Sequence, residues 1–181
     1  MNKTFSIAAL SLSIAFSAVA AMKDPMVGGS KMYPTKNIVE NAMNSKDHTT
    51  LVAAVKAAGL VDTLEGAGPF TVFAPTNEAF AKLPAGTVDN LVKPENKDAL
   101  SKILTYHVVA GRVTASDLKK QIRAGGGTAT LKTVNGENLT AMITGGKVQI
   151  KDEKGNVSTV TIPNVYQSNG VIHVIDTVMM P

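Results

Sequence analysis

The sequence contains no cysteine and no tryptophan among its 181 residues, and only 4% of them are aromatic. The missing cysteine excludes disulfide bonds, thiol catalysis, thiolate metal sites and lipid attachment through an N-terminal cysteine. Because aromatic rings are scarce, the core must be built mostly from Val, Ile, Leu, Ala and Met. Hydrophobic residues make up 44% and charged residues 18%, which predicts one ordinary globular domain with a sizeable core.

Motifs that carry enzyme chemistry are missing as well. The sequence has no Gly-x-Ser-x-Gly elbow, no His-Glu-x-x-His pair, and no phosphate-binding glycine loop followed by Lys and Ser or Thr. The acidic stretch 152–156 lacks the spacing of a calcium loop. We therefore expect no enzyme activity, no cofactor and no metal, and a periplasmic hydrolase is the weakest of the functions considered.

Only three histidines are present for catalysis or metal binding. His48 precedes a predicted helix and is most simply a polar residue at the helix end. His107 and His173 lie in apolar stretches predicted as strands, where a titratable ring must find a hydrogen-bond partner. They are either ligands or catalytic bases, or structural side chains bonded to a backbone carbonyl or a carboxylate. The structural interpretation is favoured, because no nucleophile and carboxylate accompany them at triad spacing.

Residues 1–21 form the one long apolar stretch of the chain. Lys3 precedes an apolar run over 5–16, and Ala18-Val19-Ala20 has the small residues of a cleavage site. The run is shorter than the about 20 residues that a membrane helix needs. We predict a signal peptide, with a retained N-terminal anchor as the alternative, and hence a secreted, extracellular or periplasmic protein without a transmembrane segment. Loss of Lys3 lowers the formal charge from +4 to +3, a dispersed surplus that predicts no nucleic-acid partner.

The rest of the chain divides into a lead-in and a single domain. Residues 22–36 show no periodicity and contain Pro and Gly, which predicts a flexible lead-in before a domain over 37–181. The first part of that domain is helical in pattern. From Thr128 the period changes to two, with Asn135-Gly136 and Gly145-Gly146 as hairpin turns. The order predicts an α+β fold, with N-terminal helices packed on a C-terminal antiparallel β-meander. Helices are expected to begin at Asn37, Thr49, Thr87, Pro94 and Thr114.

One early strand is expected among the helices. Phe70 to Ala74 is rich in β-branched and aromatic residues between two prolines, which predicts a buried strand. Thr76 then provides an N-cap for a short helix, with Phe80 on its apolar face. This junction of strand and helix is expected to organise the core.

The residues of this junction, Thr71 to Phe80, closely resemble the first signature motif of the fasciclin-like domain, an extracellular adhesion and interaction module. Tyr106-His107 resembles the family's Tyr-His motif, expected here within a short strand over 106–109, and residues 169–176 resemble its closing strand motif. The resemblance covers roughly residues 33–181 and implies a single fasciclin-like domain. The motif residues given a structural role are Thr71, Phe73, Pro75, Thr76, Phe80, Tyr106, His107, Asn169, Gly170 and His173.

The resemblance also implies a function. It predicts a secreted, non-enzymatic module of cell adhesion or extracellular-matrix interaction, whose partner is a cell-surface or matrix protein or a second copy of the chain. The signal peptide and the absence of cysteine indicate a bacterial protein. In adhesive members the Tyr-His region contributes to receptor binding, and it falls on Tyr106 and His107, which alternatively are structural. Those members carry an Asp-Ile pair before the closing motif, where this sequence has Asn164 and Val165 without the charge. These four residues are the candidate partner-binding set.

A second function follows from the same resemblance and from composition. Some relatives bind apolar pigments, and a core rich in Ala, Val and Met is able to open a groove between the helices and the meander. The alternative is therefore a secreted or periplasmic protein that binds an apolar small molecule or pigment.

Overall fold

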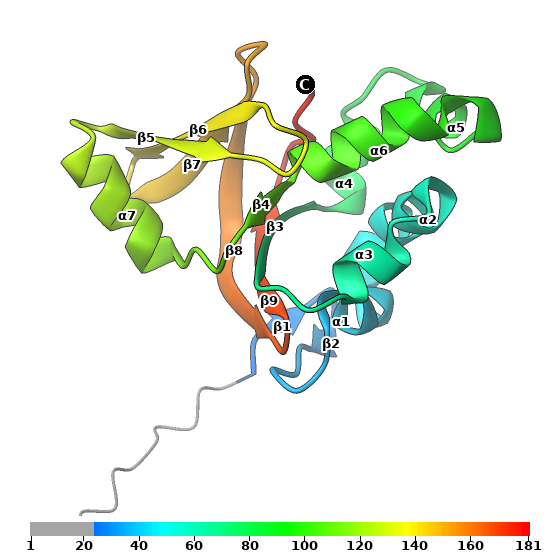
Figure 1. Ribbon diagram of the computed structural model, residues 1–181, viewed down its shortest axis with the longest axis horizontal. Coiled ribbons are helices and arrows are strands. Elements are labelled where there is room, and N and C mark those ends of the chain that lie inside the picture. Colours follow the sequence, from blue (N-terminus) through cyan, green and yellow to red (C-terminus); the bar gives the residue numbers. More distant parts are fainter. Residues whose placement is uncertain (1–23) are drawn as a thin grey trace, which may run out of the picture.

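The computed structural model describes residues 24–181, and the predicted signal peptide lies outside them (Figure 1). The helical elements, in chain order, are α1 (Ile38–Asn44), η1 (Lys46–His48), α2 (Thr49–Ala58), α3 (Val61–Glu65), α4 (Asn77–Ala81), α5 (Thr87–Leu91), η2 (Pro94–Asn96), α6 (Lys97–Tyr106) and α7 (Ala115–Ala124). The strands are β1 (Met26–Val27), β2 (Ser30–Lys31), β3 (Phe70–Pro75), β4 (Val108–Ala110), β5 (Thr128–Lys132), β6 (Asn138–Thr144), β7 (Lys147–Lys151), β8 (Val157–Gln167) and β9 (Gly170–Ile175).

Seven strands form one sheet in the order β4-β3-β9-β8-β7-β6-β5. Neighbours pair antiparallel except β3 and β9, which run parallel with Phe73 opposite His173. The two outer strands approach each other, because Val134 donates its N–H to the Val108 carbonyl at 2.8 Å and Val109 forms a bridge with Thr133. The sheet is therefore nearly a closed barrel, and the predicted α+β class is confirmed.

Helices cover the sheet on two sides. In Figure 1, α1 to α6 lie on one side of β3 and β9, whereas α7 lies on the other side against the meander strands β5 to β7. Successive residues of β3 and β9 point into two separate clusters of buried side chains, one under α1 to α6 and one inside the meander. Every residue of β9 is buried, which confirms the prediction that both faces of the last strand are covered.

Local chemistry places the helix ends where the sequence indicates them. Asn37 and Thr114 each form a capping box with the acidic residue three positions later, which satisfies two N–H groups at each helix start. Thr76 Oγ1 accepts from the Ala79 N–H, so the strand of the junction passes into α4 as predicted. Gly59 ends α2 at a φ of +69°, with the following N–H bonded to the Val55 carbonyl.

Two expectations differ from the structure. Tyr106 is the last residue of α6 and His107 its C-cap, so the predicted strand over 106–109 begins only at Val108. The helix extends because the His107 ring bonds back to the Ile103 carbonyl. Within the predicted lead-in 22–36, β1 and β2 form a hairpin, and Val27 and Met32 are buried in the cluster under the helices.

Candidate functional site

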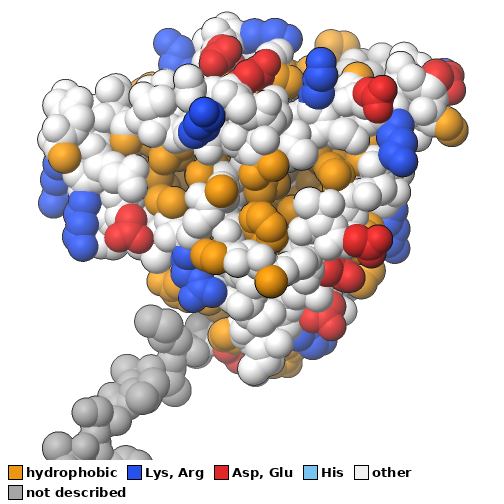
Figure 2. Space-filling view, in the orientation of Figure 1, with side chains coloured by type: hydrophobic (Ala, Val, Ile, Leu, Met, Phe, Trp, Pro, Cys, Tyr) orange, Lys and Arg blue, Asp and Glu red, His pale blue; other side chains and the backbone are white. Residues whose placement is uncertain are grey.

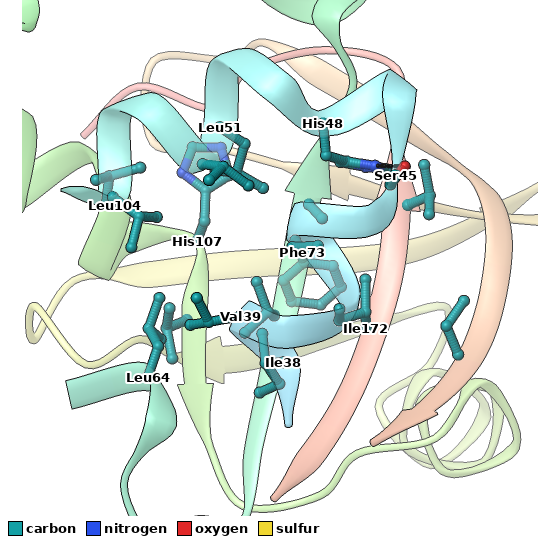
Figure 3. A pocket seen from close by; sticks show the side chains of 18 of the residues that line it. Ile38, Val39, Ser45, His48, Leu51, Leu64, Phe73, Leu104, His107 and Ile172 are labelled. Atoms are coloured by element: carbon teal, nitrogen blue, oxygen red, sulfur yellow. Dashed lines mark hydrogen bonds between the residues drawn. The ribbon is translucent and has the colours of Figure 1, made fainter. Parts of the chain in front are cut away.

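An apolar cavity of about 40 Å³ lies between the N-terminal helices and the sheet. Its wall combines aliphatic side chains from distant segments, among them Val39, Leu51, Leu64, Leu104 and Ile172 (Figure 3). In Figure 2, hydrophobic side chains surround a hollow at the centre of the face, in the region where Figure 1 draws α3, β3 and β4. The predicted groove between helices and sheet therefore has a counterpart in the structure.

His48 lies at a helix end, as the sequence indicated, between η1 and α2, but it is only 3% exposed and lies on the wall of this cavity. Its Nδ1 is 2.8 Å from Ser45 Oγ, as the dashed line in Figure 3 shows. Its Nε2 is the one buried side-chain nitrogen or oxygen in residues 24–181 that has no hydrogen-bond partner. Burial lowers the pKa of His48, and the backbone carbonyl of Ala74 partly opposes that shift, although it does not complete a hydrogen bond.

His107 also touches the cavity, but both of its ring nitrogens are used. The Met179 N–H donates to Nε2 at 3.0 Å, so the proton must reside on Nδ1, which donates to the Ile103 carbonyl at 2.7 Å. Complete burial lowers the pKa of this ring from 6.5 to about 4, so it is neutral at pH 7. This arrangement matches the structural interpretation, with a backbone carbonyl as the partner.

His173 is held in the same way on the other side of β3. Its Nε2 donates to the Val113 carbonyl at 2.8 Å, and its Nδ1 accepts the Asn164 N–H at 3.2 Å. The ring stacks on Phe73 with centroids 5.7 Å apart. Burial lowers the pKa of His173, so it too is a neutral structural ring rather than a free base.

The Tyr106 side chain points into the meander cluster, away from the cavity that His107 touches. Its hydroxyl donates to the Asn138 carbonyl at 3.0 Å and accepts the Glu153 N–H at 3.1 Å. Burial raises the pKa of Tyr106, and its relative exposure is 0%. Tyr106 and His107 are adjacent in sequence, but their side chains pack in two different parts of the core and form no common surface.

The other candidate pair divides in a similar way. Val165 is fully buried in the cluster under the helices, which corrects its assignment as a contact residue. The register of β8 shifts between Val160 and Val165, so the inward face changes from even to odd positions there. Asn164 lies at this irregularity with a φ of +58° and is half-buried, and its Oδ1 accepts the Ala115 N–H at the start of α7.

The closing motif joins the sheet to the helices. Asn169 Oδ1 accepts the Ile38 N–H at 3.0 Å, and its Nδ2 donates to the carbonyls of Leu64 and Gly66. Gly170 lies so close to the Phe70 carbonyl that a Cβ there would approach it to 2.1 Å. At the first motif, Thr71 Oγ1 donates to the Gly111 carbonyl and accepts the Val113 N–H.

The polar surface beside Asn164 is open to solvent. A groove of about 600 Å³ includes Arg112, Asn164, Tyr166 and Ser168, and a second opening of about 540 Å³ shares Arg112 and Ser168 with it. We call this surface the Arg112 groove. The Arg112 side chain is exposed and makes one long contact of 3.4 Å with the Gln167 carbonyl. Sequence reasoning found Asn164 through the family motif, but no sequence signal marked Arg112 or Tyr166.

Residues 24–181 contain no group of three or more His, Asp or Glu side chains that would hold a metal ion. Within the same range, no helix is long and apolar enough to cross a membrane. The buried polar groups of the motifs are instead paired with backbone groups. The described residues therefore contain an apolar cavity and an open polar groove as candidate sites.

Comparison with known proteins gives a consistent family. The sequence model of the fasciclin domain family matches residues 46–181 of this chain. Protein sll1483 of Synechocystis sp. is 50% identical over 159 residues, which covers 88% of this chain and 81% of that protein. The cell surface glycolipoprotein MPB83 of Mycobacterium bovis is 35% identical over 165 residues, which covers 91% of this chain and 64% of that protein.

A solved structure agrees in fold. It is the domain pair from the insect cell adhesion molecule fasciclin I, with a TM-score of 0.71 and 21% sequence identity. The similarity covers 81% of this chain but 51% of the solved chain, so this protein spans about half of that pair.

Proposed function

Since the chain belongs to the fasciclin domain family, we propose that it is an exported, non-enzymatic module that binds a protein of the cell surface or matrix. The observation that supports this function is the use of the motif residues. The polar side-chain atoms of His107, His173 and Tyr106 form hydrogen bonds with backbone groups inside the protein. These side chains are therefore not available to act on a substrate. The relative named as a cell surface protein supports the proposed location.

The Arg112 groove is the surface we assign to the partner. Tyr and Arg are the residue types that most often dominate protein interfaces, and Arg112 and Tyr166 lie together in this groove. Asn164 belongs to the same groove and is the part of the predicted binding set that reaches its surface. Because the described chain holds one domain, strong adhesion would require several copies on one surface, since avidity depends on multivalent contact.

Binding to isolated envelopes of the producing bacterium tests this function. The wild-type protein should be retained in a saturable way, and Arg112→Glu should reduce retention by about tenfold, as expected for a central interface residue. Lys119→Glu on the exposed face of α7 is the matched control, because it makes the same change of charge and should leave retention unchanged. Equal retention of both variants would contradict the proposed surface, and no saturable retention of the wild type would contradict the function.

The apolar cavity favours a second function, the binding of a small apolar molecule. An engineered cavity of about 150 Å³ lined by apolar side chains stays dry and binds benzene. The cavity here, of about 40 Å³, is smaller, so in this conformation it admits a short chain and not a pigment. Mass spectrometry of material that co-purifies with the protein from its own host tests this function. An absence of any small apolar molecule would count against it.

A further inference from the structure

The further inference deepens this second function and rests on it. His48 lines the cavity, and its buried Nε2 has no hydrogen-bond partner within residues 24–181, although the Ala74 carbonyl acts on the ring. Leaving a buried polar atom without a partner costs about 1–3 kcal/mol, so such atoms in native proteins call for an explanation. The other polar rings and hydroxyls at the wall are occupied: Ser45 Oγ bonds to His48 Nδ1, and both nitrogens of His107 bond to the backbone.

The shape and chemistry of the wall favour a flexible chain over a flat ring. The aromatic ring at the wall, Phe73, already stacks on His173. Apart from Ser45, Lys56 and the two histidines, the remaining wall is aliphatic, with Leu51, Leu64 and Ile172 among its side chains (Figure 3). A planar ligand would find little aromatic surface to stack on, whereas an alkyl chain gains by removing its apolar surface from water.

The ligand group that meets His48 must be neutral, because Lys56, a cation that also borders the cavity, is exposed to solvent. His48 is itself buried and its pKa is lowered, so it brings no positive charge to balance a carboxylate at pH 7. Moving an unpaired charge into this apolar space would cost far more than one hydrogen bond returns. A single water molecule is a poor occupant, since a buried water typically makes about three hydrogen bonds and this wall has one unpaired side-chain atom.

A hydroxyl suits His48 whichever ring nitrogen carries the proton. If Ser45 donates to Nδ1, then Nε2 carries the proton and the ligand oxygen accepts it; if Nδ1 donates to Ser45, then Nε2 accepts from the hydroxyl. The Ala74 carbonyl, which also acts on this ring, belongs to the same wall. We propose that the cavity binds the end of an aliphatic alcohol, with its hydroxyl bonded to His48 Nε2 and its short chain among Leu51, Leu64 and Ile172.

Solution NMR with ethanol and propane as probes, which match in size, tests this inference on the full mature chain. The methyl signals of Leu51, Leu64 and Ile172 and the Nε2 signal of His48 report binding at each end of the ligand. We expect saturable methyl shifts with both probes and an Nε2 shift with ethanol only. His48→Leu should weaken ethanol binding by about fivefold to tenfold, the value of one hydrogen bond, and leave propane binding unchanged. His48→Gln, which keeps a hydrogen-bonding group, should restore part of the loss.

Filling the cavity is the control for the location. Leu64→Phe should abolish the shifts with both probes. If a variant fails to fold, the Nε2 signal of the wild type still decides the question. Methyl shifts without any change at Nε2 would overturn the hydroxyl contact and leave the second function standing. No saturable shift with either probe would overturn both the contact and the second function.

Discussion

The N–H of Met179 donates to Nε2 of His107 across 72 positions of sequence, at a distance of 3.0 Å. This contact clamps the last residues of the chain to the end of α6, and Met179 is completely buried there. It also requires the His107 ring to be neutral, because a protonated Nε2 has no lone pair to accept the bond. The signature motif at 106–107 is thereby tied to the stability of the fold.

Acid should destabilise the protein through His107. Its pKa is about 4 in the folded state and 6.5 in its ordinary state, so the unfolded chain binds the proton first as the pH falls. The contribution of neutral His107 to the free energy of unfolding is fully present above about pH 6.5 and declines as the pH falls toward 4. By about pH 4 the loss of this contribution has lowered the free energy of unfolding by roughly 3 kcal/mol. The lowered pKa values of His48 and His173 act in the same direction.

Urea unfolding from pH 7.5 to 4 measures this dependence. His107→Gln removes the titrating group but keeps an acceptor for Met179, so its free energy of unfolding should depend on pH less steeply, by roughly one proton. An unchanged slope in this variant would show that His107 does not carry the acid sensitivity.

Asn169 should be the most important polar side chain of the closing motif for stability. It connects α1 and the end of α3 to the turn before β9 through three hydrogen bonds. Asn169→Ala should lower the free energy of unfolding by about 2–3 kcal/mol, because it leaves the Ile38 N–H and two carbonyls without their partner. Ser168→Ala, at the exposed neighbouring position, should change it by under about 0.5 kcal/mol. A cost for Asn169→Ala as small as that of the control would be incompatible with this role.

Asn164 combines a left-handed backbone with a cap on α7. Asn164→Ala should cost about 1–2 kcal/mol, since alanine is strained at a φ of +58° and offers no acceptor to Ala115. Asn164→Asp keeps the acceptor and adds a negative charge at a helix N-terminus, so its unfolding free energy should lie within about 0.5 kcal/mol of wild type. Thermal and urea unfolding of the two variants measure these differences. If Asn164→Asp lowered the free energy of unfolding as much as Asn164→Ala, the capping role would be excluded.

Features set by neighbouring residues were predictable from the sequence. The caps at Asn37, Thr76 and Thr114, the Gly59 ending of α2 and the period-two meander all depend on contacts within a few positions. The parallel pairing of β3 with β9 was not predictable from the sequence, because it joins segments a hundred residues apart and no local pattern encodes it.

Val165 was misplaced, and the burial of His48 was not foreseen, for similar reasons. The irregularity in β8 turns Val165 inward, and an alternating pattern read along one strand does not reveal such a shift. His48 does lie at a helix end as predicted, but only the fold shows that it is buried beside the cavity. The Arg112 groove gathers residues from separate segments, so only the folded chain identifies it.

The central claim is that the motif residues stabilise the fold, whereas the Arg112 groove binds the partner. The most direct measurement compares Tyr106→Phe with Arg112→Glu for both unfolding free energy and envelope retention per folded molecule. Tyr106→Phe should lose about 2 kcal/mol of stability, since Glu153 N–H and the Asn138 carbonyl lose their partner, with retention unchanged. Arg112→Glu should lose retention with stability unchanged. The reverse result, with Tyr106→Phe stable but unable to bind and Arg112→Glu binding normally, would contradict the account.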